Sequence, residues 1–335
     1  MYPNHSRSSI GAGETSPARN RAANSPLWPR LLGIVGGLGP LAHIELERRL
    51  LDAAKERLGK LGRASTDQGY PPWIVASLPH TPDRTEALEL KGPSPVPMLL
   101  RALTILETCG CDFALIACNT SHAWMSELKE KASIPLLNIV EETIRAAVRL
   151  CGPAARIGLL GTNGMVRHRV YPAQAEAISD QLRFLSPLSL EGGEHAQETV
   201  MSCIYGPRKC DGTRSGGLKA GIHETDAVTR QRFQDDLCRI IDQLTEKGAQ
   251  AIILGCTELP LILGPATIKR KTGRQIELLE PMEIAARSAI RIAAGKAPLP
   301  GGAIEHTPLQ NRPAIAPPPS ALTGAEWQRQ EIFKT

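Results

Sequence analysis

The sequence predicts an α/β fold of two similar lobes, each a mostly parallel sheet flanked by helices. Two observations predict it. Short apolar runs alternate with amphipathic segments, which is typical of a parallel sheet covered by helices on both faces. A pattern of glycine-rich strand ends and apolar runs ending in cysteine also occurs twice, which favours two related lobes. We expect a pseudo-twofold axis between the lobes and a cleft where they face each other.

The elements of the first half follow from their hydrophobic patterns. A short apolar run bounded by turn residues favours a buried strand, and a longer segment with one apolar face favours a helix. We expect strands at 31–35, 73–77 and 113–117, helices at 41–58 and 96–108, and a further strand beginning at 156–157.

An internal repeat predicts the second lobe. Glycines at 33, 36 and 39 recur with the same spacing at 158, 161 and 164, an offset of 125 residues. The segment from Leu106 to Cys118 shares its leucine, glycine and terminal cysteine with the segment from Leu244 to Cys256, at an offset of 138 residues. The offsets differ by 13 residues, so the second half carries a net insertion, which we place at Gly206–Gly217.

The domain boundaries follow from this repeat and from the composition of the two ends. We predict lobe 1 at 31–136, completed by a helix at 282–297, and lobe 2 at 137–281. Residues 1–30 and 298–335 are rich in Pro, Ser, Ala and Arg and have no hydrophobic period. Such composition is typical of disordered segments, so we expect both ends to lie outside the core.

Composition and charge limit the possible partners. Hydrophobic residues make up 42% of the 335-residue chain and charged residues 22%, as in ordinary globular proteins. Much of the net charge of +5 lies in residues 1–30, so we expect no nucleic-acid partner. No apolar run reaches the length of about 18 residues that a membrane span needs, and the first thirty residues lack the apolar core of a secretory signal. We expect a cytoplasmic protein, with an organelle transit peptide in residues 1–30 as the alternative.

Two of the eight cysteines, Cys118 and Cys256, end matching strands of the repeat. The chain has no C-x-x-C pair, so we expect no metal site. Because no secretory signal is recognised, we expect the thiols to be reduced. Ligands of α/β sheets bind beyond the carboxyl ends of the strands, which would place both thiols on one cleft. Free amide groups at a strand end can lower the pKa of a thiol. Two opposed thiols suit the inversion of a carbon stereocentre, because one removes a proton while the other delivers one.

Three segments resemble the signature segments of the aspartate/glutamate racemase superfamily, and its aspartate-racemase branch in particular. They are Gly33–Pro40, Cys118–His122 and Gly255–Pro260. The resemblance covers about residues 31–295. It implies two catalytic cysteines, a small-molecule amino-acid substrate, no pyridoxal phosphate, no metal or other cofactor, and a homodimer.

The resemblance also implies the substrate-binding residues. Arg84 stands in a Pro-Asp-Arg-Thr segment and Lys219 in a Leu-Lys-Ala-Gly segment, each of which binds a carboxylate in the family; Lys209 is the alternative to Lys219. A guanidinium suits this role because its planar fork matches a carboxylate. Two such cations suggest aspartate or glutamate as substrate. The remaining candidates are Gly37, Asn119, Thr120, Thr257 and Glu258.

Some residues near these motifs have open roles or depart from the family pattern. His122 lies four residues after Cys118, so it either tunes the thiol or packs as a core or capping residue. Glu258 either holds Thr257, reaches a substrate amino group or lies at a helix start as an N-terminal acid. Leu38 stands where the family usually has Met, and Glu280 stands where it often has Asp. We expect the longer side chain of Glu280 to change lobe packing or substrate preference.

Other functions fit parts of the sequence. Gly37-x-Gly39-x-x-Ala42 matches a dinucleotide fingerprint, but the second strand ends without the acid that a dehydrogenase needs. A cysteine hydrolase needs only one thiol. A broad-specificity amino-acid racemase, a maleate isomerase and a hydantoin racemase remain alternatives within the superfamily, whereas its decarboxylases lack one thiol. A two-lobed amino-acid-binding protein is the non-enzymatic alternative.

Overall fold

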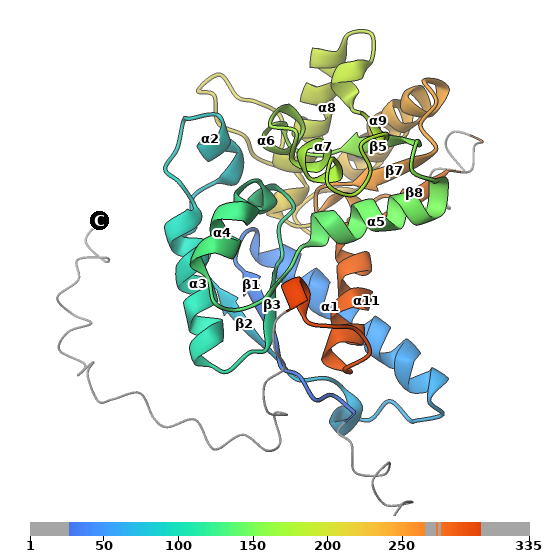
Figure 1. Ribbon diagram of the computed structural model, residues 1–335. Helices are drawn as coiled ribbons and strands as arrows, with labels where there is room; N and C mark the ends of the chain where they lie inside the picture. Colours follow the sequence, from blue (N-terminus) through green and yellow to red (C-terminus); the bar gives the residue numbers. More distant parts are fainter. Residues whose placement is uncertain (1–26, 265–272, 274–275, 303–335) are drawn as a thin grey trace, which may run out of the picture.

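Two four-stranded parallel sheets form the centre of the computed structural model, which describes residues 27–264, 273 and 276–302 (Figure 1). The first sheet has the order β2-β1-β3-β4, and the second has the order β6-β5-β7-β8. The two orders correspond strand for strand, so the α/β class and the internal repeat are confirmed. The strands are β1 (Leu32–Gly36), β2 (Trp73–Ser77), β3 (Phe113–Ile116), β4 (Leu136–Leu137), β5 (Arg156–Leu160), β6 (Arg183–Leu185), β7 (Ala251–Leu254) and β8 (Glu277–Leu279).

Helices flank both sheets. The two helices predicted at 41–58 and 96–108 begin and end within two residues of the observed ones. The helices are α1 (Pro40–Lys60), α2 (Arg84–Leu88), α3 (Val96–Thr108), α4 (Met125–Lys131), α5 (Ile139–Cys151), α6 (Asn163–Arg167), α7 (Val170–Ala175), α8 (Gly193–Tyr205), α9 (Ala227–Glu246) and α11 (Pro281–Ala293). Short 3-10 turns include η2 (Thr120–Trp124), η4 (Leu218–Ala220), η5 (Leu259–Leu261) and η6 (Pro300–Gly302).

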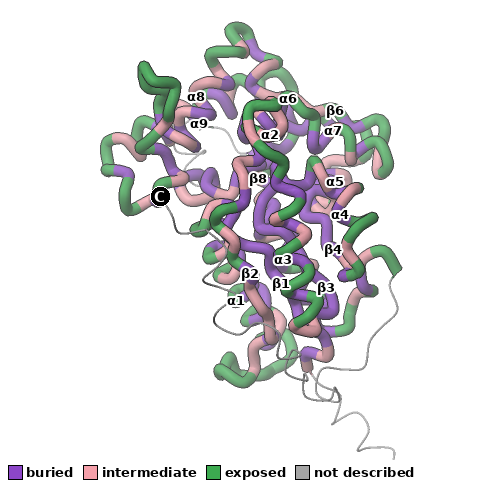
Figure 2. The backbone as a smooth tube through the Cα atoms, turned by 90° about the vertical axis from the view of Figure 1, so that its left-hand side faces the viewer, coloured by how far each residue is buried: buried purple, intermediate pink, exposed green. Residues whose placement is uncertain are grey.

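A continuous hydrophobic core joins the two sheets. One cluster of buried residues includes Ile34 on β1, Ile144 on α5, Ile157 on β5 and Ile290 on α11. Figure 2 shows the strands of the first sheet as a buried centre beneath more exposed helices. Helix α11 follows the second sheet in the chain but packs against α1 and α5 (Figure 1). Arg49 on α1 donates from Nε to Oε1 of Glu280 at 2.8 Å, so this departure from the family pattern ties α1 to the start of α11.

The ends predicted to be disordered, 1–30 and 298–335, include residues that pack against the folded core. Trp28 is buried and donates its indole N–H to the carbonyl of Gly69 at 2.7 Å. Arg30 donates to the carbonyls of Ile292 and Ala297, and Leu299 is buried. A single anchoring aromatic residue in a Pro- and Ser-rich segment leaves no period for sequence reasoning to detect. The rest of the prediction, residues 1–26 and 303–335, lies outside the described residues.

The net insertion of the second half is a balance of two changes. Strands β5 and β6 begin at 156 and 183, closer together than β1 and β2 at 32 and 73. Strands β6 and β7 begin at 183 and 251, much farther apart than β2 and β3 at 73 and 113. The stretch Gly206–Gly217 belongs to this longer connection but accounts for only part of it, because sequence offsets report only the net difference.

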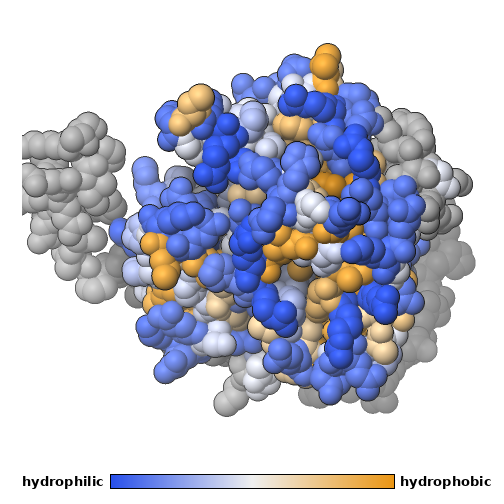
Figure 3. Space-filling model, turned by 90° about the horizontal axis from the view of Figure 1, so that it is seen from above, coloured by the Kyte–Doolittle hydropathy of each residue, from blue (hydrophilic) through white to orange (hydrophobic). Residues whose placement is uncertain are grey.

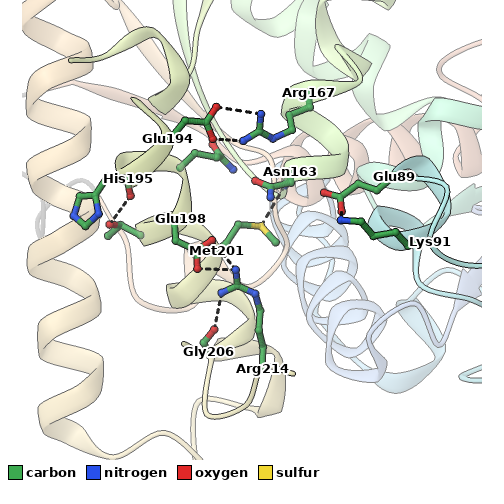
Figure 4. A network of polar contacts seen from close by, with 12 residues as sticks. Glu89, Lys91, Asn163, Arg167, Glu194, His195, Glu198, Met201, Gly206 and Arg214 are labelled. Carbon is green, nitrogen blue, oxygen red and sulfur yellow. Dashed lines mark hydrogen bonds and ion pairs between the residues drawn. The ribbon is translucent and has the colours of Figure 1, made fainter. Parts of the chain in front are cut away.

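A polar network holds the stretch Gly206–Gly217 against α8 (Figure 4). Arg214 donates to both carboxylate oxygens of Glu198 at 2.7 and 2.6 Å and to the carbonyl of Gly206 at 3.0 Å. The backbone N–H of Asn163 points to the sulfur of Met201 at 3.2 Å, which joins α8 to the start of α6. These contacts fix the C-terminal end of α8.

The surface seen from above in Figure 3 is mostly hydrophilic, with hydrophobic residues exposed near the middle of that face and at its left edge. Among the described residues, no helix has both the length and the apolar character needed to cross a membrane.

Candidate active site

The two predicted catalytic cysteines occupy equivalent positions in the two sheets. Cys118 lies two residues after the end of β3, and Cys256 lies two residues after the end of β7. Both are buried, with 9% and 6% of their surface exposed. Because β3 and β7 have the same place in the two strand orders, the structure gives each lobe one thiol at the carboxyl end of a central strand.

Lys219, on η4, brings the two thiols into one site. Burial acts to lower the pKa of Lys219, but Glu258, Tyr205, Cys256 and Cys118 together raise it above its usual value. Lys219 Nζ lies 3.5 Å from Oε1 of Glu258 and 5.2 Å from the centre of the Tyr205 ring. One ammonium therefore interacts electrostatically with the cysteines of both lobes.

The alternative cation, Lys209, lies exposed on the loop after α8, and none of its described contacts involves a site residue. Its backbone N–H bonds to the carbonyl of Thr213. Of the two candidates, the structure therefore brings only Lys219 to the thiols.

The Cys256 thiol is held by a carboxylate two residues away. Its Sγ donates to Oε2 of Glu258 at 2.9 Å, and Thr257 Oγ1 donates to the same oxygen at 2.8 Å. Burial acts to raise the pKa of Glu258, but Lys219 and these two hydrogen bonds lower it, so Glu258 is an anion. Burial and the Glu258 charge raise the pKa of Cys256 well above its usual value, although Lys219 opposes them.

The expectation of a lowered thiol pKa is therefore wrong for Cys256. It rested on amide groups at the strand end and took no account of a buried carboxylate as hydrogen-bond acceptor. Cys256 rests as a neutral thiol with its hydrogen directed at Glu258.

Arg84, the first residue of α2, lies beside the other thiol. Its guanidinium donates to the carbonyls of Leu38 at 2.5 Å and Pro82 at 3.1 Å, and the residue is 8% exposed. Burial acts to lower the pKa of Arg84, but Cys118 and Asp83 raise it above its usual value. The carbonyl of Leu38 ties this cation to the glycine loop after β1, so the guanidinium is oriented by the backbone before any substrate binds.

The two glycines of this loop have different neighbours. Gly37 has φ +82°, and a Cβ there would lie 2.6 Å from the backbone of Leu78, so close packing requires a glycine. Gly39 has φ +108°, and a Cβ there would lie 3.3 Å from Oε1 of Glu258 and 3.6 Å from Nζ of Lys219. Gly39, rather than the predicted Gly37, borders the Lys219–Glu258 ion pair.

Asn119 and Thr120 join the two lobes next to Cys118. The side-chain oxygen of Asn119 accepts from the Tyr171 hydroxyl at 2.7 Å, and Thr120 Oγ1 lies 3.2 Å from Thr162 Oγ1. The buried Nδ2 of Asn119 has no hydrogen-bond partner among the described residues. This amide is therefore a free donor beside the first thiol.

Two site residues were missed in the sequence. Tyr205, at the end of α8, lies under Lys219, and its hydroxyl is 3.4 Å from Oδ2 of Asp83. Burial raises its pKa, so it is a neutral phenol. No motif marks Tyr205, whereas Thr162 could have been found, since 161–164 aligns with the glycine loop at 36–39 in the repeat.

His122 supports the backbone of Cys118, and none of the hydrogen bonds of its ring within the described residues reaches the thiol. Nδ1 lies 2.9 Å from the carbonyl of Cys118, and Nε2 accepts from the N–H of Ile139 at 3.3 Å. Since Nε2 is an acceptor, Nδ1 carries the hydrogen of a neutral ring. Burial lowers the pKa of His122 to about 4.

This buried histidine predicts an acid-dependent loss of stability. The unfolded chain takes up a proton near pH 6.5, whereas the folded chain does so only near pH 4. The stabilising effect of the neutral ring is thus complete above pH 6.5 and falls as the pH drops toward 4, by about 3 kcal/mol. Denaturant unfolding of the wild type and His122→Gln at pH 7.5, 6.0 and 5.0 measures it. The difference in the free energy of unfolding between the wild type and the variant is expected to shrink as the pH falls. A difference that stays constant would contradict a buried, neutral His122.

Among the described residues, no group of three or more His, Cys, Asp or Glu side chains is arranged to hold a metal ion.

Comparison with known proteins identifies the family of the chain. A family model described as Asp/Glu/Hydantoin racemase matches it twice, at residues 35–199 and 193–289. The broad specificity amino-acid racemase of Bacillus subtilis is 31% identical over 145 residues, which are 42% of this chain and 58% of that protein. The glutamate racemase of Desulforudis audaxviator is 25% identical over 56% of this chain and 59% of that protein. The chain thus spans about three fifths of the length of these curated relatives.

Two solved structures share the fold. The aspartate racemase of Picrophilus torridus matches with a TM-score of 0.60 at 23% identity, covering 80% of this chain and 95% of that chain. An aspartate racemase homologue from Pyrococcus horikoshii matches with a TM-score of 0.55 at 20% identity, covering 79% of this chain and 99% of that chain.

Proposed function

The chain belongs to the Asp/Glu/Hydantoin racemase family, and from this premise we propose that it interconverts the L and D forms of aspartate or glutamate with Cys118 and Cys256 as its two acid/base groups. One observation carries the proposal: two thiols at equivalent strand ends share the electrostatic environment of Lys219. Because each thiol belongs to a different lobe, a substrate held between them would present opposite faces of its α-carbon to the two sulfurs.

The proposed reaction needs only proton transfers. In one direction the Cys118 thiolate removes the α-proton, the electron pair of the broken C–H bond delocalises into the α-carboxylate, and Cys256 delivers its proton to the opposite face. The hydrogen bond from Cys256 to Glu258 supports this starting state, because it keeps a proton on the second sulfur. Arg84 and the free amide of Asn119 are donors beside the first thiol that suit the charge developing on the carboxylate. No step uses a cofactor.

Optical rotation or circular dichroism of L-aspartate, L-glutamate and L-alanine, incubated separately with the purified protein and no added cofactor, tests this proposal. Racemisation in heavy water places deuterium on the α-carbon. Binding without any loss of optical activity would instead support an amino-acid-binding protein.

A broad-specificity amino-acid racemase is the second candidate. Lys219 is already paired with Glu258 at 3.5 Å, so one of the two cations expected to bind substrate carboxylates has a partner within the chain. The similarity to the broad specificity racemase of Bacillus subtilis favours the same alternative. Faster turnover of L-alanine than of L-aspartate would select it.

Replacing Glu258 is expected to change the pH dependence of turnover. The alkaline limb of the profile reports the loss of the proton that Cys256 must deliver. Since the Glu258 charge raises the pKa of Cys256, Glu258→Gln moves this limb to lower pH. The measurement is kcat/KM against pH in the direction that uses Cys256 as the acid. Thr257→Val is the matched control, because it removes a hydrogen bond to the same oxygen without removing charge. An alkaline limb at the same pH in both variants would refute the role of Glu258.

The family resemblance further leads us to propose a cytoplasmic homodimer that binds neither nucleic acid nor membranes. Light scattering of the purified protein tests the dimer.

A further inference from the structure

Two adjoining cavities lie along helices α5 and α11, the first beside η6 and the second beside α1, and no candidate catalytic residue lines either of them. The first has a volume of about 470 Å³ and the second about 410 Å³. Arg149, Ser288 and Arg291 line both. Helix α11 packs against both α1 and α5 (Figure 1), and the residues shared by the two cavities lie on α5 and α11. Each volume is in the range of small-molecule sites.

The linings are strongly basic. Seven basic side chains and three carboxylates line the two cavities, which open to solvent, so their net positive charge attracts anions. The basic residues are Arg57, Lys60, Lys129, Arg145, Arg149, Arg287 and Arg291, and the acidic residues are Glu56, Glu141 and Glu142.

All three carboxylates already have partners. Glu56 pairs with Lys60 and Arg287. Glu141 accepts from Lys129 at 3.0 Å and from the Asn138 amide at 2.8 Å, and Glu142 accepts from the Ser288 hydroxyl at 2.5 Å.

Within the described part of the chain this leaves four lining arginines that have neither an ion pair nor a side-chain hydrogen bond: Arg57 and the exposed Arg145, Arg149 and Arg291. Two of these four, Arg149 and Arg291, line both cavities. The carboxylates that line the cavities therefore do not neutralise the two arginines at the shared boundary.

Arg57 gives a second, independent observation. Its guanidinium carbon lies 5.8 Å from the centre of the Trp28 ring, which holds the group in place at the second cavity. Its Nε is buried, and it has no hydrogen-bond partner among the described residues. A buried N–H without an acceptor costs free energy, and a bound acceptor removes that cost.

We propose that the two cavities form one binding site for a small polyanion that carries a diphosphate or triphosphate group. Guanidinium groups bind phosphate oxygens through paired, charge-assisted hydrogen bonds, and the unpaired arginines supply such groups on both sides of the shared boundary. Helix α5 follows the first sheet in the chain and α11 follows the second, so the ligand contacts both connections between the lobes. The proposal is independent of the racemase reaction.

Calorimetric titration of the full chain with pyrophosphate, and its thermal unfolding with and without pyrophosphate, test this site. We expect one ligand per chain, an affinity that weakens with added salt, and a raised Tm. The double variant Arg149→Ala/Arg291→Ala is expected to bind at least about tenfold more weakly. Arg101→Ala is the matched control, since Arg101 is exposed on α3 and lines neither cavity; it leaves binding unchanged.

Three results would overturn the proposal. They are no binding of pyrophosphate to the wild type, equal binding by the wild type and the double variant, and binding of a single-stranded oligonucleotide through these arginines in the absence of pyrophosphate binding. Circular dichroism shows whether each variant is folded. Because binding is measured without substrate, a failure of the proposed racemase function leaves this test unaffected.

Discussion

Cys118→Ala and Cys256→Ala are each expected to abolish racemisation while the fold is retained. Each thiol serves one face of the α-carbon, so neither can replace the other. General acid–base groups contribute about 10²- to 10⁴-fold to a rate, and inversion requires both groups in every turnover. We expect turnover to fall by at least about 10³-fold in each variant, measured by the loss of optical rotation of L-aspartate.

The single variants also separate the two half-reactions. A variant that keeps one thiol can still exchange the α-proton of the enantiomer that faces that thiol, without inversion. Proton NMR in heavy water should therefore show exchange of one enantiomer in Cys118→Ala and of the other in Cys256→Ala. Cys203→Ala is the matched control, because Cys203 is buried on α8 within the core. Near-wild-type racemisation by either of the first two variants would refute the two-base mechanism.

The positions of the thiols could be predicted because they depend on a pattern within the chain. Strands β3 and β7 are fully buried, so their apolar runs are continuous, and a parallel strand of this kind ends where polar residues begin. The repeat then assigned Cys118 and Cys256 to equivalent strand ends. Local periodicity carries this information without any knowledge of the packing between lobes.

The electrostatic state of the site could not be predicted in the same way. The pKa of Cys256 depends on the rotamer of Glu258 and on Lys219, which lies on a separate turn in the long connection between β6 and β7. Tyr205 reaches Asp83 across a sequence separation of 122 residues. Contacts of this length follow from the way the lobes pack, and a single sequence holds no pattern for them. The anchoring of Trp28 against Gly69 escaped prediction for another reason, because a single aromatic residue forms no hydrophobic period.

Arg84→Leu is expected to lower kcat/KM by roughly 30-fold to several thousand-fold. Removing one partner of a desolvated charge pair costs on the order of 2–5 kcal/mol, and each 1.4 kcal/mol is about a factor of ten. The structure adds that the same guanidinium holds the carbonyls of Leu38 and Pro82. Arg84→Lys is therefore the control: it keeps the charge but loses the fork, so it separates charge from orientation.

The choice of substrate shows which carboxylate each cation binds. The comparison uses L-aspartate, L-glutamate and L-alanine with the wild type, Arg84→Leu and Lys219→Met. If Arg84 binds the α-carboxylate, Arg84→Leu slows all three substrates by similar factors; if it binds the side chain, L-alanine is spared. Lys219→Met is expected to have a smaller effect through the substrate, because an ammonium is a point charge without paired geometry.

Lys219→Met also leaves Glu258 buried without its cation, which is costly in itself. The double variant Lys219→Met/Glu258→Gln removes both charges and isolates the contribution of Lys219 to substrate binding. If Lys219 binds a side-chain carboxylate, the double variant loses L-aspartate turnover while its L-alanine turnover is maintained. If L-alanine is the best substrate of the wild type and Arg84→Leu has no effect, the assignment of acidic substrates is wrong, and the second candidate, a racemase of broad specificity, is selected.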